Sequence, residues 1–311
     1  MSMAYLNRRS IGRTGLDLPR LGFGCAEIGG LLRPVSEADA EATLRAAWSL
    51  GIRYYDVAPV YGYGRSEMRL GRFLRGIPRN DYVLSTKVGH PTPAKFDYTR
   101  DGVLRDFEAS LKRLGVDRVD ILYIHDPDDY WQDVVDGAYP ALHRLREEGV
   151  VGAIGAGMGG IKMLTRLAYE TEMDIFLLSN RYSLVDQTAL PEFLPACVER
   201  GIAVVIGGVM SSGILADPKP GSLYEYRPAG SDMIERAQGL RAICEKHGVT
   251  LRAAAVQFST AHPAVACLLT GTSSIEHLNE YPDLMGESIP GALWEELRAS
   301  GLLPTDAPVP L

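Results

Sequence analysis

The stretch Tyr54-Tyr55-Asp56-Val57-Ala58-Pro59-Val60-Tyr61-Gly62 decides how this chain is interpreted. A short β-rich run over residues 52–56 ends in an acid, a turn containing proline and glycine follows, and a tyrosine closes the stretch. In a parallel α/β barrel, the side chains that do chemistry stand at the carboxyl ends of the strands. Asp56 and Tyr61 are therefore candidate catalytic residues at the mouth of such a barrel.

Two later strands end in residues of matching chemistry. Lys87 closes the run Leu84-Ser85-Thr86-Lys87, and His125 closes the run Ile121-Leu122-Tyr123-Ile124-His125. Because parallel strands of a barrel end at one rim, three consecutive strands bring an acid, a phenol, an amine and an imidazole together. Each residue also has an explanation without catalysis. Asp56 could stabilise a turn or cap a helix, and Tyr61 could pack half-buried. Lys87 could extend to solvent from the strand end, and His125 could be a core histidine with its hydrogen bonds satisfied.

The pattern of a short apolar strand followed by an amphipathic helix repeats along the chain. Helix starts and stops are marked by residues such as Ser36 and Gly51. The expected strands cover residues 21–24, 54–56, 82–87, 119–125, 151–156, 175–178, 203–206 and 266–269. The expected helices cover residues 37–49, 66–75, 101–114, 134–148, 160–169, 188–199, 233–246 and 274–285, with an extra helix over 249–261.

These eight units predict a single (β/α)8 TIM barrel domain over residues 1–311. Residues 8–19 predict a β-hairpin before the first barrel strand. A doubly wound sheet is the alternative. It is disfavoured because Gly22-Phe23-Gly24 lacks the third glycine of a dinucleotide fingerprint, and the glycines at 155–160 come too late in the chain.

Composition bounds the remaining classes. Apolar residues make up 46% of the 311 residues, enough for a large core, and charged residues make up 23%. The net charge of −7 argues against a nucleic-acid partner. No apolar run is long enough to cross a membrane and no secretory leader is evident, so a cytoplasmic protein is expected. The four cysteines form no CxxC pair and are interpreted as reduced thiols.

With these residues in place, the chain resembles the aldo-keto reductase superfamily. Asp56, Tyr61, Lys87 and His125 match the catalytic tetrad of that superfamily in type and order. The segments at Asp97-Tyr98, 110–120, 125–128 and 207–213 resemble its aldose 1-dehydrogenase branch. That branch includes L-fucose, D-threo-aldose and L-galactose dehydrogenases and a pyridoxal 4-dehydrogenase.

The tetrad implies chemistry at a substrate oxygen. The nicotinamide carries the hydride. Tyr61 is expected to act as general base in oxidation and as general acid in reduction. A free phenol has a pKa of about 10. Lys87 at hydrogen-bonding distance is expected to lower that value, with Asp56 holding the amine and His125 orienting the substrate oxygen.

The resemblance also implies a nicotinamide site over the later strands. No lysine or arginine lies between residues 270 and 281, where NADP-preferring relatives often place one, so NAD is favoured. NADP stays the alternative if Ser273 and a distant arginine bind the phosphate. Gly157-Met158, Ser179 and Gly207 depart from the usual reductase residues. The expected cofactor contacts are Ser179, Gly207, Met210, Ser211, Gly213, Leu215, Gly271, Thr272, Ser273, His277 and Glu280.

The rim loops supply the expected substrate contacts, which are Cys25, Tyr63, Asp126 and Trp131. Acids and an aromatic beside His125 suit a polyhydroxylated ring, because carboxylates accept hydroxyl hydrogen bonds and an indole covers a C–H face. A solvated acidic loop with Trp131 packed on the barrel edge is the alternative. No metal is expected, because no second histidine lies at ligand spacing in the sequence.

The function expected from the resemblance is oxidation of the anomeric hydroxyl of an aldose to the lactone, with NAD as acceptor. The alternatives are oxidation of pyridoxal and general aldehyde or ketone reduction with NADPH. From another class, a nicotinamide-sensing regulatory barrel stays open, and a metal-dependent hydrolase is disfavoured. The expected partner is a small molecule, with neither nucleic acid nor membrane. The oligomeric state is not indicated.

Overall fold

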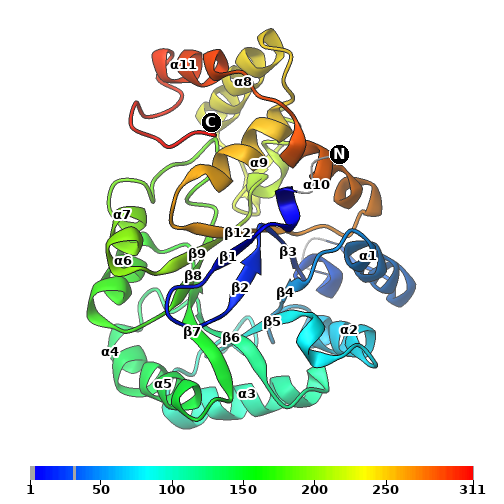
Figure 1. Cartoon of the computed structure of the whole chain (residues 1–311), viewed down its shortest axis with the longest axis vertical. Helices are drawn as coiled ribbons and strands as arrows, with labels where there is room; N and C mark the ends of the chain where they lie inside the picture. The colour runs from blue at the N-terminus through cyan, green and yellow to red at the C-terminus, as the bar shows by residue number, and fades with distance from the viewer. Residues whose placement is uncertain (1–3, 31–32, 311) are drawn as a thin grey trace.

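Eight parallel strands close into a barrel in the computed structural model, which describes residues 4–30 and 33–310 (Figure 1). The strands follow one another around the barrel in chain order, and the last pairs with the first. This confirms the predicted (β/α)8 fold. The barrel strands are β3 (Leu21–Gly24), β4 (Tyr54–Asp56), β5 (Val83–Val88), β6 (Val119–His125), β7 (Val151–Met158), β8 (Ile175–Ser179), β9 (Ala203–Gly207) and β12 (Val265–Thr270).

Helices surround this barrel and bury their apolar faces against it (Figure 1). Ser36 starts the first of them, since its hydroxyl accepts a hydrogen bond from the Asp39 backbone N–H at 3.1 Å. The ring contains α1 (Glu37–Ser49), α2 (Arg65–Leu74), α3 (Arg100–Leu114), α5 (Tyr139–Glu147), α6 (Ile161–Glu170), α7 (Phe193–Arg200), α9 (Leu251–Ala261) and α10 (Ile275–Gly286).

The predicted N-terminal hairpin is present and closes one end of the barrel. Its strands β1 (Arg8–Ser10) and β2 (Asp17–Pro19) pair antiparallel. Ile11 and Leu18 are fully buried and pack in the barrel interior with Tyr54 and Ile121. Arg9 donates to the Pro263 carbonyl, just before β12, at 3.0 Å. The hairpin therefore fills the end where the strands begin and leaves the opposite rim open to function.

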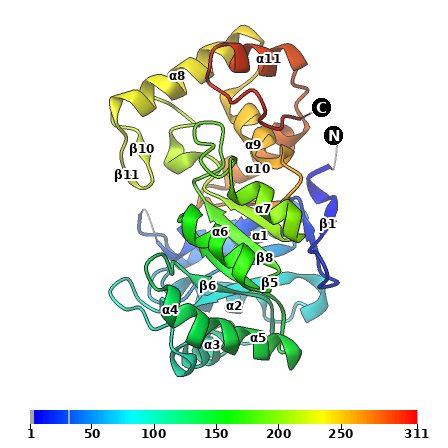
Figure 2. The same ribbon diagram turned by 90° about the vertical axis from the view of Figure 1, so that its left-hand side faces the viewer.

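Two helices were assigned to the wrong places by sequence. The helix α9 packs on β12 and α10, whereas α8 (Ser231–Lys246) packs on α9 and on α11 (Gly291–Ala299). Figure 2 shows α8 and α11 together, outside the barrel ring. The extra helix is thus α8, and α9 is the barrel helix, because α9 carries the longer run of buried side chains. The helix α11 was not predicted.

Local chemistry shifts other helix bounds. The helix predicted over 134–148 begins with a π-helical turn, η4 (Val134–Ala138), before α5, and the short α4 (Trp131–Asp133) precedes it. Pro140 has no backbone N–H to donate, and the Tyr139 N–H bonds back to the Val134 carbonyl. The helix predicted from residue 188 begins only at Phe193, since the preceding turn is held by Asp186, which accepts from the Thr188 N–H at 2.8 Å.

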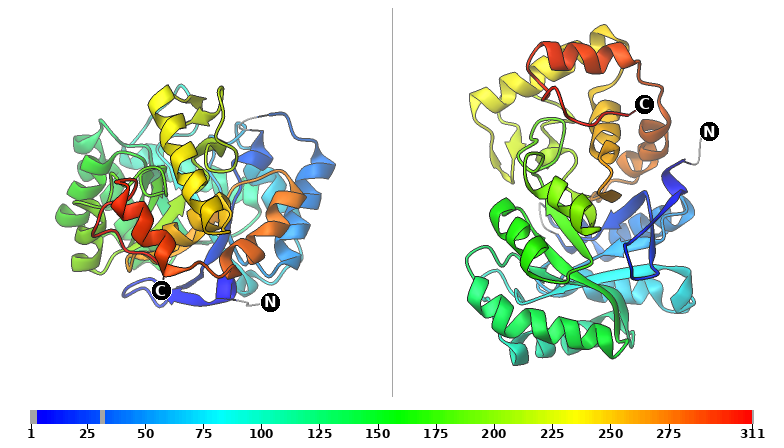
Figure 3. Two further views of the ribbon diagram at one scale, coloured as in Figure 1. Left: turned by 90° about the horizontal axis from the view of Figure 1, so that it is seen from above. Right: turned by 60° about the vertical axis from the view of Figure 1, so that its left-hand side comes forward.

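The long loop after β9 contains a second small hairpin that was not predicted, β10 (Leu223–Tyr224) with β11 (Arg227–Pro228). Glu225 and Tyr226 form its turn with positive φ angles of 50° and 62°. Figure 2 places this hairpin and the N-terminal hairpin on opposite sides of the barrel, and the right-hand view of Figure 3 agrees. Within the described ranges, no helix is long and apolar enough to cross a membrane.

Candidate active site

The four residues singled out by sequence meet at the open rim. Asp56 ends β4, Lys87 lies at the end of β5, and His125 ends β6. The ring of Tyr61, in the loop after β4, stands edge-on to the His125 ring, with 5.8 Å between centroids and an interplanar angle of 87°. The structure therefore brings the acid, the amine, the phenol and the imidazole into one cluster.

Asp56 and Lys87 form a buried ion pair. Lys87 Nζ donates to Asp56 Oδ2 at 2.6 Å and to the Val57 carbonyl at 3.0 Å. The other carboxylate oxygen of Asp56 accepts from the Ser85 hydroxyl at 2.6 Å. Lys87 is 1% exposed and Asp56 is 3% exposed. A buried charge is tolerated only when paired and hydrogen-bonded, so each side chain fixes the position of the other.

Tyr61 differs from expectation in its relation to Lys87. The amine lies 5.0 Å from the centroid of the Tyr61 ring, and no hydrogen bond joins it to the Tyr61 hydroxyl in the part of the chain that is described. Burial, followed by the charges of Asp56 and Asp126, raises the pKa of Tyr61 well above 10. The predicted lowering of this pKa by Lys87 is therefore wrong for this structure, and the phenol is protonated at neutral pH.

His125 is held as a neutral imidazole. Burial lowers the pKa of His125 to about 3, against the opposing effect of Asp126. Its backbone is fixed by Tyr98, whose hydroxyl donates to the carbonyls of His125 at 2.7 Å and of Asp126 at 2.8 Å. Burial raises the pKa of Asp126, but the neighbouring His125 and His90 outweigh this and the pKa is lowered overall. The rim therefore carries a neutral ring beside an ionised carboxylate.

The ends of β8 and β9 form a cradle with an unsatisfied amide. Asn180 follows Ser179, donates its side-chain amide to the Ser179 hydroxyl at 3.1 Å, and leaves its buried Oδ1 without a hydrogen-bond partner among the described residues. Gly208 has a φ of 72°, and a Cβ there would come within 2.2 Å of that oxygen. A buried acceptor without a partner suits the carboxamide N–H of a nicotinamide. Sequence reasoning named Ser179 and Gly207 but missed Asn180.

The loop from Met210 to Leu215 is partly internal. Ser211 and Leu215 are fully buried, and the Ser211 hydroxyl donates to Ser183 at 3.1 Å. Gly213 has a φ of 102° and open space where a Cβ would be. Ser211 and Leu215, predicted as cofactor contacts, are therefore not accessible to a cofactor in this structure, whereas Met210 and Gly213 are partly exposed.

The N-terminus of α10 is where the adenosine end of the cofactor is predicted to bind. Ser274 caps it by accepting from the His277 N–H at 3.3 Å, and Thr272 accepts from the Ser274 N–H at 3.0 Å. Free N–H groups at a helix N-terminus suit a phosphate. Gly271 keeps open space beside this turn. These residues fit the pyrophosphate and ribose part of a nicotinamide dinucleotide.

Two arginines from outside residues 270–281 reach this end. Arg33 donates to the Ser273 hydroxyl from Nη2 at 3.1 Å and from Nε at 3.4 Å. Arg252 forms an ion pair with Glu280. Arg33 is the distant arginine that the NADP alternative requires. No local sequence pattern points to it, because it lies on the loop after β3, far from α10 along the chain.

The predicted substrate contacts divide into two groups. Cys25 is fully buried beneath the rim, where burial and then Asp56 raise the pKa of its thiol, so it packs and does not face a substrate. Tyr63 is 73% exposed. The Trp131 ring is covered on one face by the Arg166 guanidinium at 3.5 Å. Asp126, with a φ of 47°, lies beside His125 and keeps a partly exposed carboxylate.

Sequence reasoning missed an aromatic group at the same rim. The His90 ring stacks on Phe96 with centroids 4.2 Å apart, and lies 5.4 Å from the His125 ring. Phe96 also stacks on Tyr130. The expectation that no second histidine lies near His125 was therefore wrong, since His90 is distant in sequence and adjacent in space.

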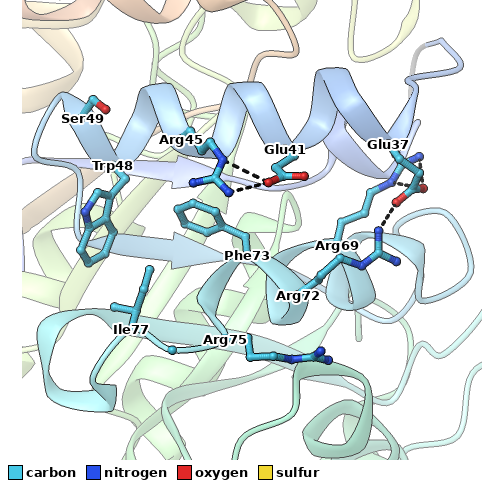
Figure 4. A pocket seen from close by; sticks show the side chains of 11 residues that line it. Glu37, Glu41, Arg45, Trp48, Ser49, Arg69, Arg72, Phe73, Arg75 and Ile77 are labelled. Carbon is cyan, nitrogen blue, oxygen red and sulfur yellow. Dashed lines mark hydrogen bonds and ion pairs between the residues drawn. The ribbon is translucent and has the colours of Figure 1, made fainter.

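A surface hollow of about 530 Å³ lies elsewhere, between α1 and α2 (Figure 4). None of the tetrad lines it. Its charges pair with one another: Arg45 bonds Glu41 at 2.6 Å, and Arg69 and Arg72 bond Glu37 at 2.7 and 2.8 Å. The Arg69 and Arg72 pairs join α2 to Glu37 of α1, whereas the Arg45–Glu41 pair lies within α1. The chemistry belongs to the barrel rim.

A protonated phenol and a neutral imidazole over a buried acid–amine pair, beside a cradle that fits nicotinamide, define an oxidoreductase built on a (β/α)8 barrel. The profile of the aldo/keto reductase family matches residues 20–297, and the chain belongs to that family. The family uses nicotinamide cofactors and acts on small molecules.

Individual relatives agree with this assignment. The chain is 39% identical to a D-threo-aldose 1-dehydrogenase of Pseudomonas sp, over 94% of this chain and 96% of the relative. It is also 39% identical to a pyridoxal 4-dehydrogenase of Microbacterium luteolum, over 97% and 100%. An aldo-keto reductase from Bacillus halodurans, solved in its holo form, superposes with a TM-score of 0.81 at 25% identity and 98% coverage of both chains.

Proposed function

We propose that this oxidoreductase oxidises the anomeric hydroxyl of an aldose to the lactone, with NAD as the hydride acceptor. The observation that carries the proposal is the cluster in which the Tyr61 and His125 rings stand 5.8 Å apart above the Asp56–Lys87 ion pair. Similarity to the D-threo-aldose dehydrogenase supports the sugar as substrate.

In the proposed reaction, the neutral His125 ring holds the substrate oxygen by a hydrogen bond. Tyr61 first loses its own proton to solvent and then, as the phenolate, accepts the proton of that oxygen. A nicotinamide held at the Asn180 cradle would supply the acceptor for the hydride of the anomeric carbon. Lys87 lies against the Tyr61 ring, and its positive charge favours the phenolate that must form before the proton of the sugar can be accepted. Asp56 keeps Lys87 charged and fixed.

Asp126 is the group we assign to the sugar hydroxyls. Its carboxylate lies 3.7 Å from His125 Nε2 and is partly exposed at the rim. An ionised carboxylate accepts hydrogen bonds from two adjacent hydroxyls at once. This favours a polyhydroxylated ring over a simple aldehyde.

The preference for NAD is proposed from the lack of a lysine or arginine within 270–281. The Arg33–Ser273 hydrogen bonds favour the opposite choice, because a guanidinium there would pair with a 2′-phosphate. Parallel titrations with NAD and NADP decide between the two, and a lower KM for NADP would overturn the proposal.

Oxidation of pyridoxal is the second candidate, and one observation favours it. Phe96 is 40% exposed and stacks between the His90 and Tyr130 rings, close to His125. A group of aromatic rings at the rim offers contacts that suit a pyridine ring. The similarity to the pyridoxal 4-dehydrogenase points the same way.

The test is the absorbance of reduced nicotinamide during turnover of L-fucose, D-arabinose, L-galactose and pyridoxal. Reduction of NAD with a sugar supports the proposal, and reduction with pyridoxal alone supports the second candidate. In Tyr61→Phe, activity should fall by about 10²–10⁴-fold. The surface variant Tyr169→Phe is the matched control. Low activity that Tyr61→Phe leaves unchanged would favour the regulatory barrel.

A further inference from the structure

Three side chains at the rim lie close enough to share one metal ion. His90 follows β5, His125 ends β6, and Asp126 comes next in the chain. His90 Nδ1 lies 3.4 Å from Asp126 Oδ2, and His125 Nε2 lies 3.7 Å from the same oxygen. One ligand atom from each residue falls within 4.8 Å of the other two.

These separations suit a transition metal. In a tetrahedral zinc site with bonds of about 2.0–2.1 Å, neighbouring ligand atoms stand about 3.3 Å apart. Two of the three separations are already near that value, and the third, between the two imidazole nitrogens, is no more than 4.8 Å. Two histidines and a carboxylate are also the ligand set of open zinc sites, in which water or substrate takes the fourth position.

The two histidines are short of hydrogen bonds. Within residues 4–30 and 33–310, both ring nitrogens of His90 and the Nδ1 of His125 are buried without a hydrogen-bond partner. His125 itself is only 7% exposed. Buried polar atoms are nearly always satisfied. The unpartnered His90 Nδ1, which lies 3.4 Å from Asp126 Oδ2, therefore points to a missing ligand, whereas the unpartnered Nδ1 of His125 is not the nitrogen that faces Asp126.

The cluster is held in place before any ion arrives. Tyr98 donates to the backbone carbonyls of both His125 and Asp126, at 2.7 and 2.8 Å. The His90 ring is fixed by its stack on Phe96. The Asp126 side chain is 44% exposed and gives an entry path from solvent. The ligands are therefore preorganised around an accessible position.

We propose that His90, His125 and Asp126 form a binding site for a divalent transition-metal ion of the zinc type, and that the bound ion blocks the substrate oxygen from His125. The ion would occupy His125 Nε2 and the Asp126 carboxylate together. Inhibition should then compete with the substrate and not with the cofactor. Binding stands on the geometry alone, whereas the inhibition rests on the proposed function.

Binding is tested without turnover by titrating the chelator-treated protein with Co²⁺, whose visible absorption is strong in a four-coordinate site. The wild-type protein should saturate at one equivalent. His90→Gln should weaken binding by on the order of 100-fold. His143→Gln is the matched control, because His143 also lies near two carboxylates, Glu147 at 3.6 Å and Glu172 at 3.7 Å, and should change nothing.

Asp126→Asn provides a second variant if His90→Gln does not fold, and circular dichroism checks both. Equal, weak Co²⁺ binding in the wild-type and variant proteins would overturn the site. The inhibition is tested with Zn²⁺ against the substrate found to be turned over, with chelator reversal. Tight binding without competition would overturn the blocking role. Absence of any turnover would count against the proposed function and leave the spectral result decisive for the site.

Discussion

Lys87 Nζ lies 2.6 Å from Asp56 Oδ2 in the barrel interior, where neither side chain reaches solvent. Removing one partner of such a pair leaves an uncompensated buried charge. Asp56→Asn should therefore lower the free energy of unfolding by about 3–5 kcal/mol. Urea denaturation measures it, with the exposed Asp129→Asn as control. A loss equal to that of the control would show that the pair is not needed for stability.

The pH dependence of oxidation follows from Tyr61. Its pKa is raised well above 10, mainly by burial, so at any pH below that value the folded protein holds less phenolate than a free phenol would. Oxidation needs the proton acceptor, so its rate should rise with pH throughout the range up to 10. Reduction uses the protonated phenol and should hold its rate over the same range. A maximum for oxidation near pH 7 would contradict this.

The pH dependence of the oxidation rate should show no inflection caused by titration of His125. Its pKa is lowered to about 3, mainly by burial, so the ring is neutral at every pH above about 4. An inflection in kcat between pH 5 and 8 that disappears in His125→Gln would show that the ring titrates, and so contradict the assignment.

Arg33 should set how well NADP is accepted. Hydrogen bonds to a charged group contribute about 1.5–3 kcal/mol, which corresponds to roughly 10–100-fold in binding. Arg33→Ala should raise the Kd for NADPH by that factor and leave the Kd for NADH within about twofold. Fluorescence titration of both reduced cofactors provides the measurement, and Arg45→Ala is the control. An equal loss for both cofactors would show that Arg33 does not recognise the 2′-phosphate.

The β10–β11 hairpin is fastened by Arg181. Its Nη2 pairs with Glu225 at 2.6 Å, while Tyr224 donates to Asp186 at 2.5 Å. Arg181→Ala removes a partly exposed pair worth up to about 1 kcal/mol, so chymotrypsin should cleave at the hairpin tyrosines roughly five times faster. Timed digestion with mass spectrometry measures this. Unchanged cleavage would mean that Tyr224 and Asp186 hold the hairpin alone.

The barrel and the tetrad could be predicted from the sequence because their signals are local. Each strand is a short apolar run, and Asp56, Lys87 and His125 each close one. Because parallel strands of a barrel end at one rim, residues that close different strands are expected to lie near one another in space.

The remaining contacts could not be predicted, because they depend on how loops approach one another. His90 and Arg33 reach the site from loops distant in sequence from His125 and Ser273. The prediction that Cys25 contacts substrate was wrong because a side chain at a strand end can turn into the protein interior. Its burial depends on how the barrel packs, which the local sequence does not show. The two helices α8 and α9 were exchanged because amphipathic spacing does not say which surface a helix covers.

The N-terminal hairpin has a consequence for handling the protein. Because Ile11 and Leu18 fill the end of the barrel opposite the catalytic rim, the chain enters the fold on the face that substrate does not use. A tether attached ahead of that hairpin would anchor the protein by its closed face. Molecules immobilised in this way would all expose their catalytic rim to the solution. The activity per unit area of support would then be proportional to the amount of protein attached.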